Sequence, residues 1–134
     1  MAVKKKKKVS LSAAKKKAWS AMSLWIRSKE AINGYCSCVT CGWTGEISSM
    51  QAGHWIPKAQ GNAIYFEETN IHPQCYRCNI NLGGNGPEYY SFMLRTYGQE
   101  ELDRLKALAK TKVNFKVPDY QAIEQKCKEL IEGL

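Results

Sequence analysis

Two Cys-x-x-Cys pairs, Cys38–Cys41 and Cys75–Cys78, are the residues of this chain whose spacing most directly indicates chemistry. A Cys-x-x-Cys turn places two thiolates on one side of a tight loop, and two such turns form a tetrahedral S4 site suited to Zn²⁺. We therefore predict a structural zinc ion, and zinc binding of this kind is worth about 10–16 kcal/mol. The alternative is that the four cysteines are unrelated buried thiols.

The other two cysteines have different expected roles. Cys36 competes with Cys38 as a ligand, but the spacing favours Cys38 and Cys41. Cys127 lies on the apolar face of a predicted helix, where we expect it to be packed. Six cysteines in a reducing compartment indicate metal binding rather than disulfides.

The segment between the two pairs, Gly42–Gln74, is longer than the roughly 15–20 residues of a plain zinc ribbon. It contains the only two histidines of the chain, His54 and His72. Its length therefore predicts a role beyond closing a loop. His72 is expected either to pack or to contact phosphate.

His54 and Asn79 are the candidate catalytic pair. We place His54 on the first strand of a hairpin, and Asn79 follows Cys78 directly, about 100° further around a helix. If Cys78 faces the zinc ion, Asn79 can face His54. A neutral imidazole can deprotonate water, and an amide oxygen is a hard ligand suited to Mg²⁺. The alternatives are a core or zinc-bound histidine, and an asparagine that only caps a helix.

Hydrophobic periodicity predicts the elements that position these residues. We expect strands near Ala52–Pro57 and Ile64–Phe66, and a short helix from Cys75 through Asn81. The other predicted helices cover Ala13–Ile32, Pro87–Tyr97, Gln99–Lys110 and Pro118–Gly133. The fold class is therefore expected to be α+β, with a small zinc-stapled core flanked by N- and C-terminal helices.

The formal charge of +8 is concentrated at the N-terminus. Residues 1–17 hold eight lysines and no acid, whereas the remainder carries equal numbers of basic and acidic residues. We expect residues 1–17 to form a disordered basic tail and residues 18–134 a single zinc-containing domain. The lysines either contact DNA or form a merely solvated tail; they are Lys4, Lys5, Lys6, Lys7, Lys8, Lys15, Lys16 and Lys17.

No stretch of the sequence approaches the roughly 18–20 apolar residues of a membrane span. The segment after the first lysines, Val9–Ala14, is too short and too polar for the core of a signal peptide. We therefore expect a soluble intracellular protein without a membrane partner.

The whole pattern, Cys-x-x-Cys, Gly-His, Asn-x4-Cys-x-x-Cys-Asn, resembles the HNH or ββα-metal nucleases. With Trp25-Ile-Arg, Gly84-Asn85 and Tyr97-Gly98, the chain is similar to the NinG (Rap) family of lambdoid phage recombination nucleases. The similarity runs from about Trp25 to Leu108. It implies a ββα-metal core in a phage-encoded protein of the bacterial cytoplasm. The implied activity is that of a metal-dependent DNA endonuclease acting on branched intermediates such as Holliday junctions or D-loops.

The resemblance also assigns roles by position. It makes His54 the general base and Asn79 the ligand of Mg²⁺ or Mn²⁺, while Asn70 braces the loop that orients His54. Gln51 and Glu46 are candidate helpers. Many relatives carry an acid just before the base as a second metal ligand, whereas this chain has Gly53, which predicts weaker metal affinity.

The expected reaction leaves 3′-hydroxyl and 5′-phosphate ends. Two-fold cutting of a four-way junction requires a dimer, and we expect the apolar C-terminal helices to supply a homodimer interface. Two other functional classes compete with the nuclease. One is a non-catalytic zinc-ribbon module that binds nucleic acid, and the other is a zinc-stapled protein-interaction adaptor.

Overall fold

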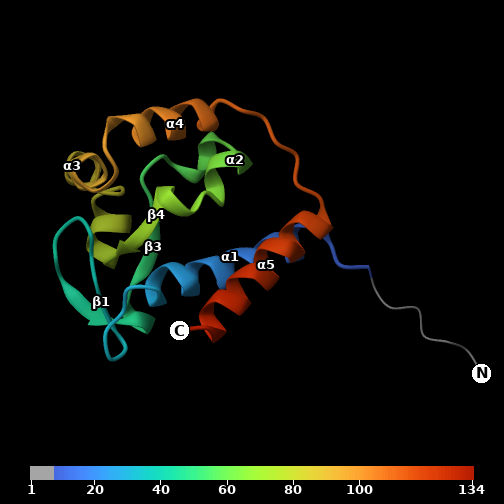
Figure 1. Ribbon diagram of the computed structural model, residues 1–134, viewed down its shortest axis with the longest axis horizontal. Helices are drawn as coiled ribbons and strands as arrows, with labels where there is room; N and C mark the ends of the chain where they lie inside the picture. Colours follow the sequence, from blue (N-terminus) through green and yellow to red (C-terminus); the bar gives the residue numbers. More distant parts are fainter. Residues whose placement is uncertain (1–7) are drawn as a thin grey trace, which may run out of the picture.

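The computed structural model describes residues 8–134 as an α+β arrangement of helices around two small antiparallel sheets (Figure 1). The candidate DNA-binding residues Lys4, Lys5, Lys6 and Lys7 lie outside the described residues. The helices are α1 (Leu11–Ser28), α2 (Asn62–Tyr65), α3 (Gly86–Tyr97), α4 (Gln99–Ala109) and α5 (Val117–Glu132). The strands are β1 (Tyr35–Ser37), β2 (Thr44–Glu46), β3 (Gln51–His54) and β4 (Ile71–Gln74). Single helical turns cover Ile47–Ser49, Lys58–Gln60, Glu68–Asn70 and Arg77–Asn81.

Helix α1 begins earlier than the sequence indicated. The Ser10 hydroxyl accepts a hydrogen bond from the Ala13 backbone N–H at 3.2 Å, which satisfies one of the free donors of the first turn. Ala14 is already buried in the core. The helix predicted from Ala13 is thus present and starts two residues earlier, so the disordered tail expected over residues 1–17 is wrong for residues 11–17. The helix ends at Ser28 rather than Ile32.

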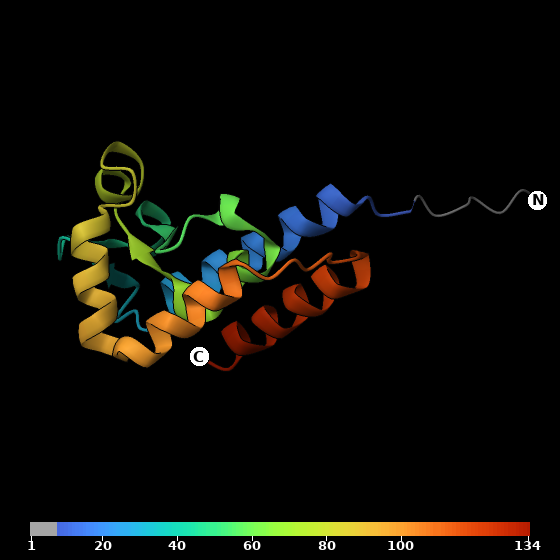
Figure 2. The same cartoon turned by 90° about the horizontal axis from the view of Figure 1, so that it is seen from above.

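Helix α5 lies along α1, as both views show (Figure 2). Tyr120 and Cys127 of α5 are buried in one cluster with Ala14, Ala18 and Met22 of α1. The prediction that Cys127 is a packed residue is confirmed. The apolar face of α5 that we expected at a dimer interface is thus largely used within the chain.

Strand β3 pairs with β4 and not with the segment expected to complete the hairpin. In the observed register Gly53 lies opposite His72, and His54 lies opposite Ile71. The predicted strand at Ile64–Phe66 is wrong. Ile64 belongs to the short helix α2 and is fully buried in a cluster formed with α3 and α4. Its burial against these helices overrides the strand preference of the β-branched and aromatic residues at 64–66.

The remaining helices follow the predictions closely. The predicted helices are Pro87–Tyr97, Gln99–Lys110 and Pro118–Gly133. Compared with them, α3 starts one residue earlier, α4 ends one residue earlier, and α5 both starts and ends one residue earlier. Within residues 8–134, none of the helices is long and apolar enough to cross a membrane.

Candidate metal centre and active site

The four cysteines of the two pairs come together where strands β1 and β4 end. The Sγ atoms of Cys38, Cys41, Cys75 and Cys78 all lie within 4.8 Å of one another, close enough to hold one metal ion such as zinc. Cys36 is outside this cluster, in agreement with the ligand choice that the spacing favoured. Four thiols at this spacing match the kind of donor set that a structural zinc site uses.

Each pair is placed by a strand end. Cys38 follows β1 and Cys75 follows β4, while Cys78 lies in the π-helical turn Arg77–Asn81. Burial by itself raises the pKa of the Cys38 thiol, but hydrogen bonds from Thr40 and from backbone groups outweigh it and lower that pKa to about 6. Against the hydrogen bond from the Trp43 backbone, burial and the neighbouring thiols raise the pKa of Cys41, and burial raises the pKa of Cys75. A thiolate is the form that binds metal, so Cys38 is the thiol of this cluster that ionises most readily before a metal binds.

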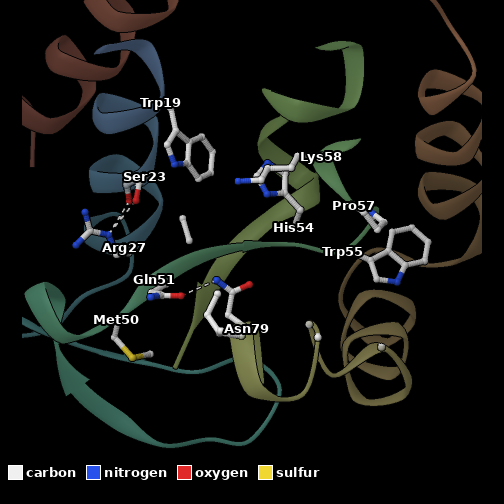
Figure 3. Close-up of a pocket in the computed structure, with 15 residues that line it drawn as sticks. Trp19, Ser23, Arg27, Met50, Gln51, His54, Trp55, Pro57, Lys58 and Asn79 are labelled. Carbon is white, nitrogen blue, oxygen red and sulfur yellow. Dashed lines mark hydrogen bonds between the residues drawn. The ribbon is translucent and has the colours of Figure 1, made fainter. Parts of the chain in front are cut away.

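A cleft of about 580 Å³ lies beside the cysteine cluster, between α1, β3 and the π-helical turn (Figure 3). His54 and Asn79 both line it, as the sequence predicted. Arg27 and Lys58 line it as well, and none of the carboxylates of residues 8–134 does. The cleft therefore presents a base, an amide and two cations, a combination suited to a phosphate-containing ligand.

The imidazole of His54 is held in one tautomer. Its Nε2 lies 2.8 Å from the Tyr65 carbonyl oxygen, which can only accept, so Nε2 carries the proton. Nδ1 has no hydrogen-bond partner within residues 8–134 and keeps its lone pair free. The hydrogen bond made by one ring nitrogen decides which of the two nitrogens of a histidine carries the proton.

Packing keeps this imidazole neutral. Trp19 of α1 stacks on the His54 ring at 4.9 Å between centroids, and Tyr65 contacts its edge. Burial lowers the pKa of His54 below its usual value, and the nearby Lys58 lowers it further, against the hydrogen bond to Tyr65. The ring is therefore a free base at neutral pH.

Asn79 is oriented by a neighbour on β3. Its Nδ2 donates to Gln51 Oε1 at 2.7 Å, which directs its Oδ1 the other way (Figure 3). The candidate helper Gln51 thus contacts the expected metal ligand. Glu46, the other candidate helper, does not line this cleft.

Asn70 lies behind the cleft rather than in it. It is 0% exposed, and its Oδ1 accepts from the Ile56 N–H at 2.9 Å while its Nδ2 donates to the Ile56 carbonyl at 3.0 Å. Nδ2 also reaches the Ile64 carbonyl. Asn70 therefore fixes the backbone two residues after His54, and it has no contact with the cleft itself.

His72 is part of a buried hydrogen-bond chain. Tyr89 donates its hydroxyl proton to the Gly53 carbonyl at 2.7 Å, so it accepts from His72 Nδ1–H at 3.0 Å. His72 Nε2 then accepts from the Tyr97 hydroxyl at 2.6 Å. Of the two roles left open for His72, the structure supports packing.

The lysines of α1 do not act as one group. Lys15 donates to Asn62 Oδ1 at 3.2 Å and lies 4.5 Å over the Tyr65 ring, near the cleft. Lys16 and Lys17 instead line a groove between α1 and α5. Lys8 is exposed ahead of the helix.

Three residues that line the cleft were not predicted from the sequence as site residues: Trp19, Arg27 and Lys58. Trp19 lies on the apolar face of the helix that the sequence predicts at Ala13–Ile32. Nothing in its spacing distinguishes a residue that packs on His54 from one that packs in the core.

Comparison with known proteins gives a consistent family. The whole chain, residues 1–134, matches the family described as Bacteriophage Lambda NinG protein. Protein ninG of Escherichia phage 933W is 28% identical over 128 residues, covering 90% of this chain and 63% of that protein. Protein ninG of Escherichia phage lambda is 31% identical over 101 residues, covering 69% and 49%. The chain thus spans about half to two thirds of the length of these relatives. No solved structure matches it.

Proposed function

The chain belongs to the NinG family of lambdoid phage proteins, and on that basis we propose that it is a metal-dependent endonuclease for branched DNA. The substrate class we assign is a recombination intermediate such as a Holliday junction or a D-loop. The core would then be of the HNH or ββα-metal type, with zinc holding the fold outside the chemistry.

The observation that carries this proposal is the state of His54. His54 lines a cleft that Asn79 also lines, and with its Nε2–H held by the Tyr65 carbonyl its Nδ1 is left unpartnered within residues 8–134. Nδ1 accepts the proton of a water molecule that attacks the scissile phosphate. General-base catalysis of this kind contributes about 10²–10⁴ in rate.

The residues fit a divalent cation of the Mg²⁺ or Mn²⁺ type. Asn79 Oδ1 is a hard oxygen donor whose partner amide Nδ2 is already held by Gln51. When bound, such a cation polarises the phosphate and stabilises the charge that develops on the leaving 3′-oxygen. The expected products carry 3′-hydroxyl and 5′-phosphate ends.

The charge of the cleft suits a phosphodiester. Arg27 is fixed by its donation to the Ile47 carbonyl at 2.8 Å and lines the cleft, as does Lys58. Lys15 lies just outside, over Tyr65. These cations position the DNA backbone, while Trp19 and Tyr65 keep the His54 ring in place.

The test is a cleavage assay on end-labelled four-way junction, flap, duplex and single strand, with Mg²⁺ and with EDTA. We expect Mg²⁺-dependent cutting, fastest on a branched substrate, with ends that a ligase can rejoin. Salt-sensitive binding without cutting of any substrate would instead support the non-catalytic zinc-ribbon module.

A further inference from the structure

Gln74, the last residue of β4, has a buried carboxamide with one unused atom. Its side chain is 0% exposed, and its Nε2 donates to the Gly84 carbonyl at 2.9 Å and to Thr40 Oγ1 at 3.1 Å. Its Oε1 has no hydrogen-bond partner, and it is the one such buried side-chain atom within residues 8–134. A buried amide oxygen without a partner costs stability, so its presence calls for a physical reason.

The orientation of this carboxamide is fixed. Because the Gly84 carbonyl can only accept, the amide group that faces it must be Nε2. A flipped Gln74 would set two oxygens against each other. Oε1 is therefore directed away from Gly84.

The unused oxygen lies over Gly53. Gln74 is opposite Gln51 in the β3–β4 register, and Gly53 shares that face of the strand because it is two residues further on. A Cβ added to Gly53 would be 1.8 Å from Gln74 Oε1 and 3.0 Å from Asn79 Oδ1. The carboxamide of Gln74 thus fills the space of a side chain at position 53.

These two distances place both amide oxygens at one spot next to Gly53. Since each is measured from the same point, Gln74 Oε1 and Asn79 Oδ1 are less than about 5 Å apart. Two oxygens bound to one Mg²⁺ are about 3–4 Å apart, because each bond is about 2.0–2.1 Å long. A bare cation also approaches an oxygen more closely than a water molecule does, so a buried oxygen can still serve as a ligand.

We propose that Gln74 Oε1 and Asn79 Oδ1 bind the same divalent cation, with Gln74 occupying the place that a side chain at position 53 would take. The assignment rests on the proposed function for its catalytic meaning, but the cation site itself is defined by the two oxygens. It accounts for three observations together: the unpartnered Oε1, its fixed direction and the side chain missing at Gly53. A neutral ligand pair also predicts moderate affinity, with DNA phosphate completing the site.

The test measures Mn²⁺ binding to the zinc-loaded full chain without DNA, from the loss of the electron paramagnetic resonance signal of free Mn²⁺. Gln74→Met removes the oxygen and should weaken binding by at least about tenfold, the lower limit seen even for outer partners of a metal. Gln74→Glu keeps an oxygen in that place and should bind Mn²⁺ at least as tightly as the parent. Gln121→Met, the same change on the exposed surface of α5, should leave binding unchanged. Zinc content and far-ultraviolet circular dichroism establish that each variant is folded.

The Glu variant separates a ligand from a structural glutamine. If Gln74 only supports the loop at Gly84, then Gln74→Glu, which cannot donate to that carbonyl, should bind Mn²⁺ as weakly as Gln74→Met. That result would overturn the proposal, and so would parent-like affinity in Gln74→Met.

A double variant and a measurement on the parent keep the test decisive if Gln74→Met loses zinc. Gly53→Asp combined with Gln74→Ala moves the ligand from β4 to β3 and should bind Mn²⁺ at least as tightly as the parent. In the unmutated protein, saturation with Mg²⁺ should shift the ¹³Cδ resonance of Gln74 and not that of Gln121. An unshifted Gln74 resonance, with Mg²⁺ bound, would overturn the proposal.

Failure of this inference differs from failure of the proposed function. Mg²⁺-dependent cleavage that Gln74→Met leaves unchanged removes Gln74 and retains the nuclease. Mn²⁺ binding that depends on Gln74 and Asn79 in a protein that cuts no DNA retains the site and removes the nuclease.

Discussion

Acidification from pH 7 to pH 5 should destabilise the folded protein by about 2 kcal/mol through His72 alone. The ring is 9% exposed and lies between the Tyr89 and Tyr97 hydroxyls. Burial lowers the pKa of His72 to about 4, with a further decrease from Lys29 and an opposing effect of Glu68. In the unfolded chain the pKa is about 6.5.

The sign follows from these two values. Between pH 6.5 and pH 4 the unfolded chain binds a proton that folded His72 does not, so stability is present above pH 6.5 and decreases as the pH falls. Each unit of difference is worth about 1.4 kcal/mol, which gives a limit of about 3 kcal/mol below pH 4. At pH 5 about two thirds of that limit is lost.

The assay is urea unfolding of zinc-saturated protein at pH 7 and pH 5, followed by tryptophan fluorescence. His72→Asn is the matched control, because its Nδ2 can donate to the Tyr89 hydroxyl as Nδ1–H does but gains no proton. Titration of the cysteines affects both proteins and cancels in the comparison. Equal losses of unfolding free energy in parent and variant would refute the role assigned to His72.

Three further predictions concern the zinc site, the tail and the strand that carries the base. Cys75→Ser should lose zinc and unfold, measured by elemental analysis and circular dichroism; a folded, zinc-loaded variant would contradict it. Deleting residues 1–9, which include Lys4 to Lys8, should flatten the slope of log affinity against log salt by up to about 4.5, with DNA-structure preference retained. An unchanged salt titration would make these lysines a solvated appendage. Tyr89→Phe should cost about 1–3 kcal/mol of unfolding free energy, because it leaves the Gly53 carbonyl without its donor; a loss below 0.5 kcal/mol would be inconsistent with this bond.

Patterns tied to fixed chemistry were readable from the sequence. The spacing of Cys38, Cys41, Cys75 and Cys78 predicted the cluster, and the position of Asn79 next to Cys78 predicted that it would share a cleft with His54. In each case the local backbone dictates where a side chain lies, so spacing suffices.

Features that depend on tertiary packing were not readable. The hairpin partner of β3 was missed because Ile64–Phe66 consists of β-branched and aromatic residues that favour strands, whereas β4 contains Pro73, which is uncommon in strands. Burial of Ile64 against α3 and α4 decides between the two. The start of α1 was placed too late because Ser10 resembles an ordinary loop residue until its cap is seen.

Gln74 was missed for a related reason. A glutamine before a Cys-x-x-Cys turn carries no signal by itself, and only the close approach of its Oε1 to Gly53 gives it a role. The glycine at position 53 was the available clue, because it leaves space beside β3 that a side chain from another strand can fill.

The most direct test of the account is single-turnover cleavage of a branched DNA by the parent protein and by His54→Ala, with Mg²⁺ and saturating enzyme. The parent rate should rise with pH, with an apparent pKa below 6.5, and then stay constant, because burial lowers the pKa of His54. The variant should cut about 10²–10⁴ times more slowly while retaining zinc and DNA affinity. A variant rate within a few-fold of the parent would contradict the assignment of His54 as the base and with it the proposed mechanism.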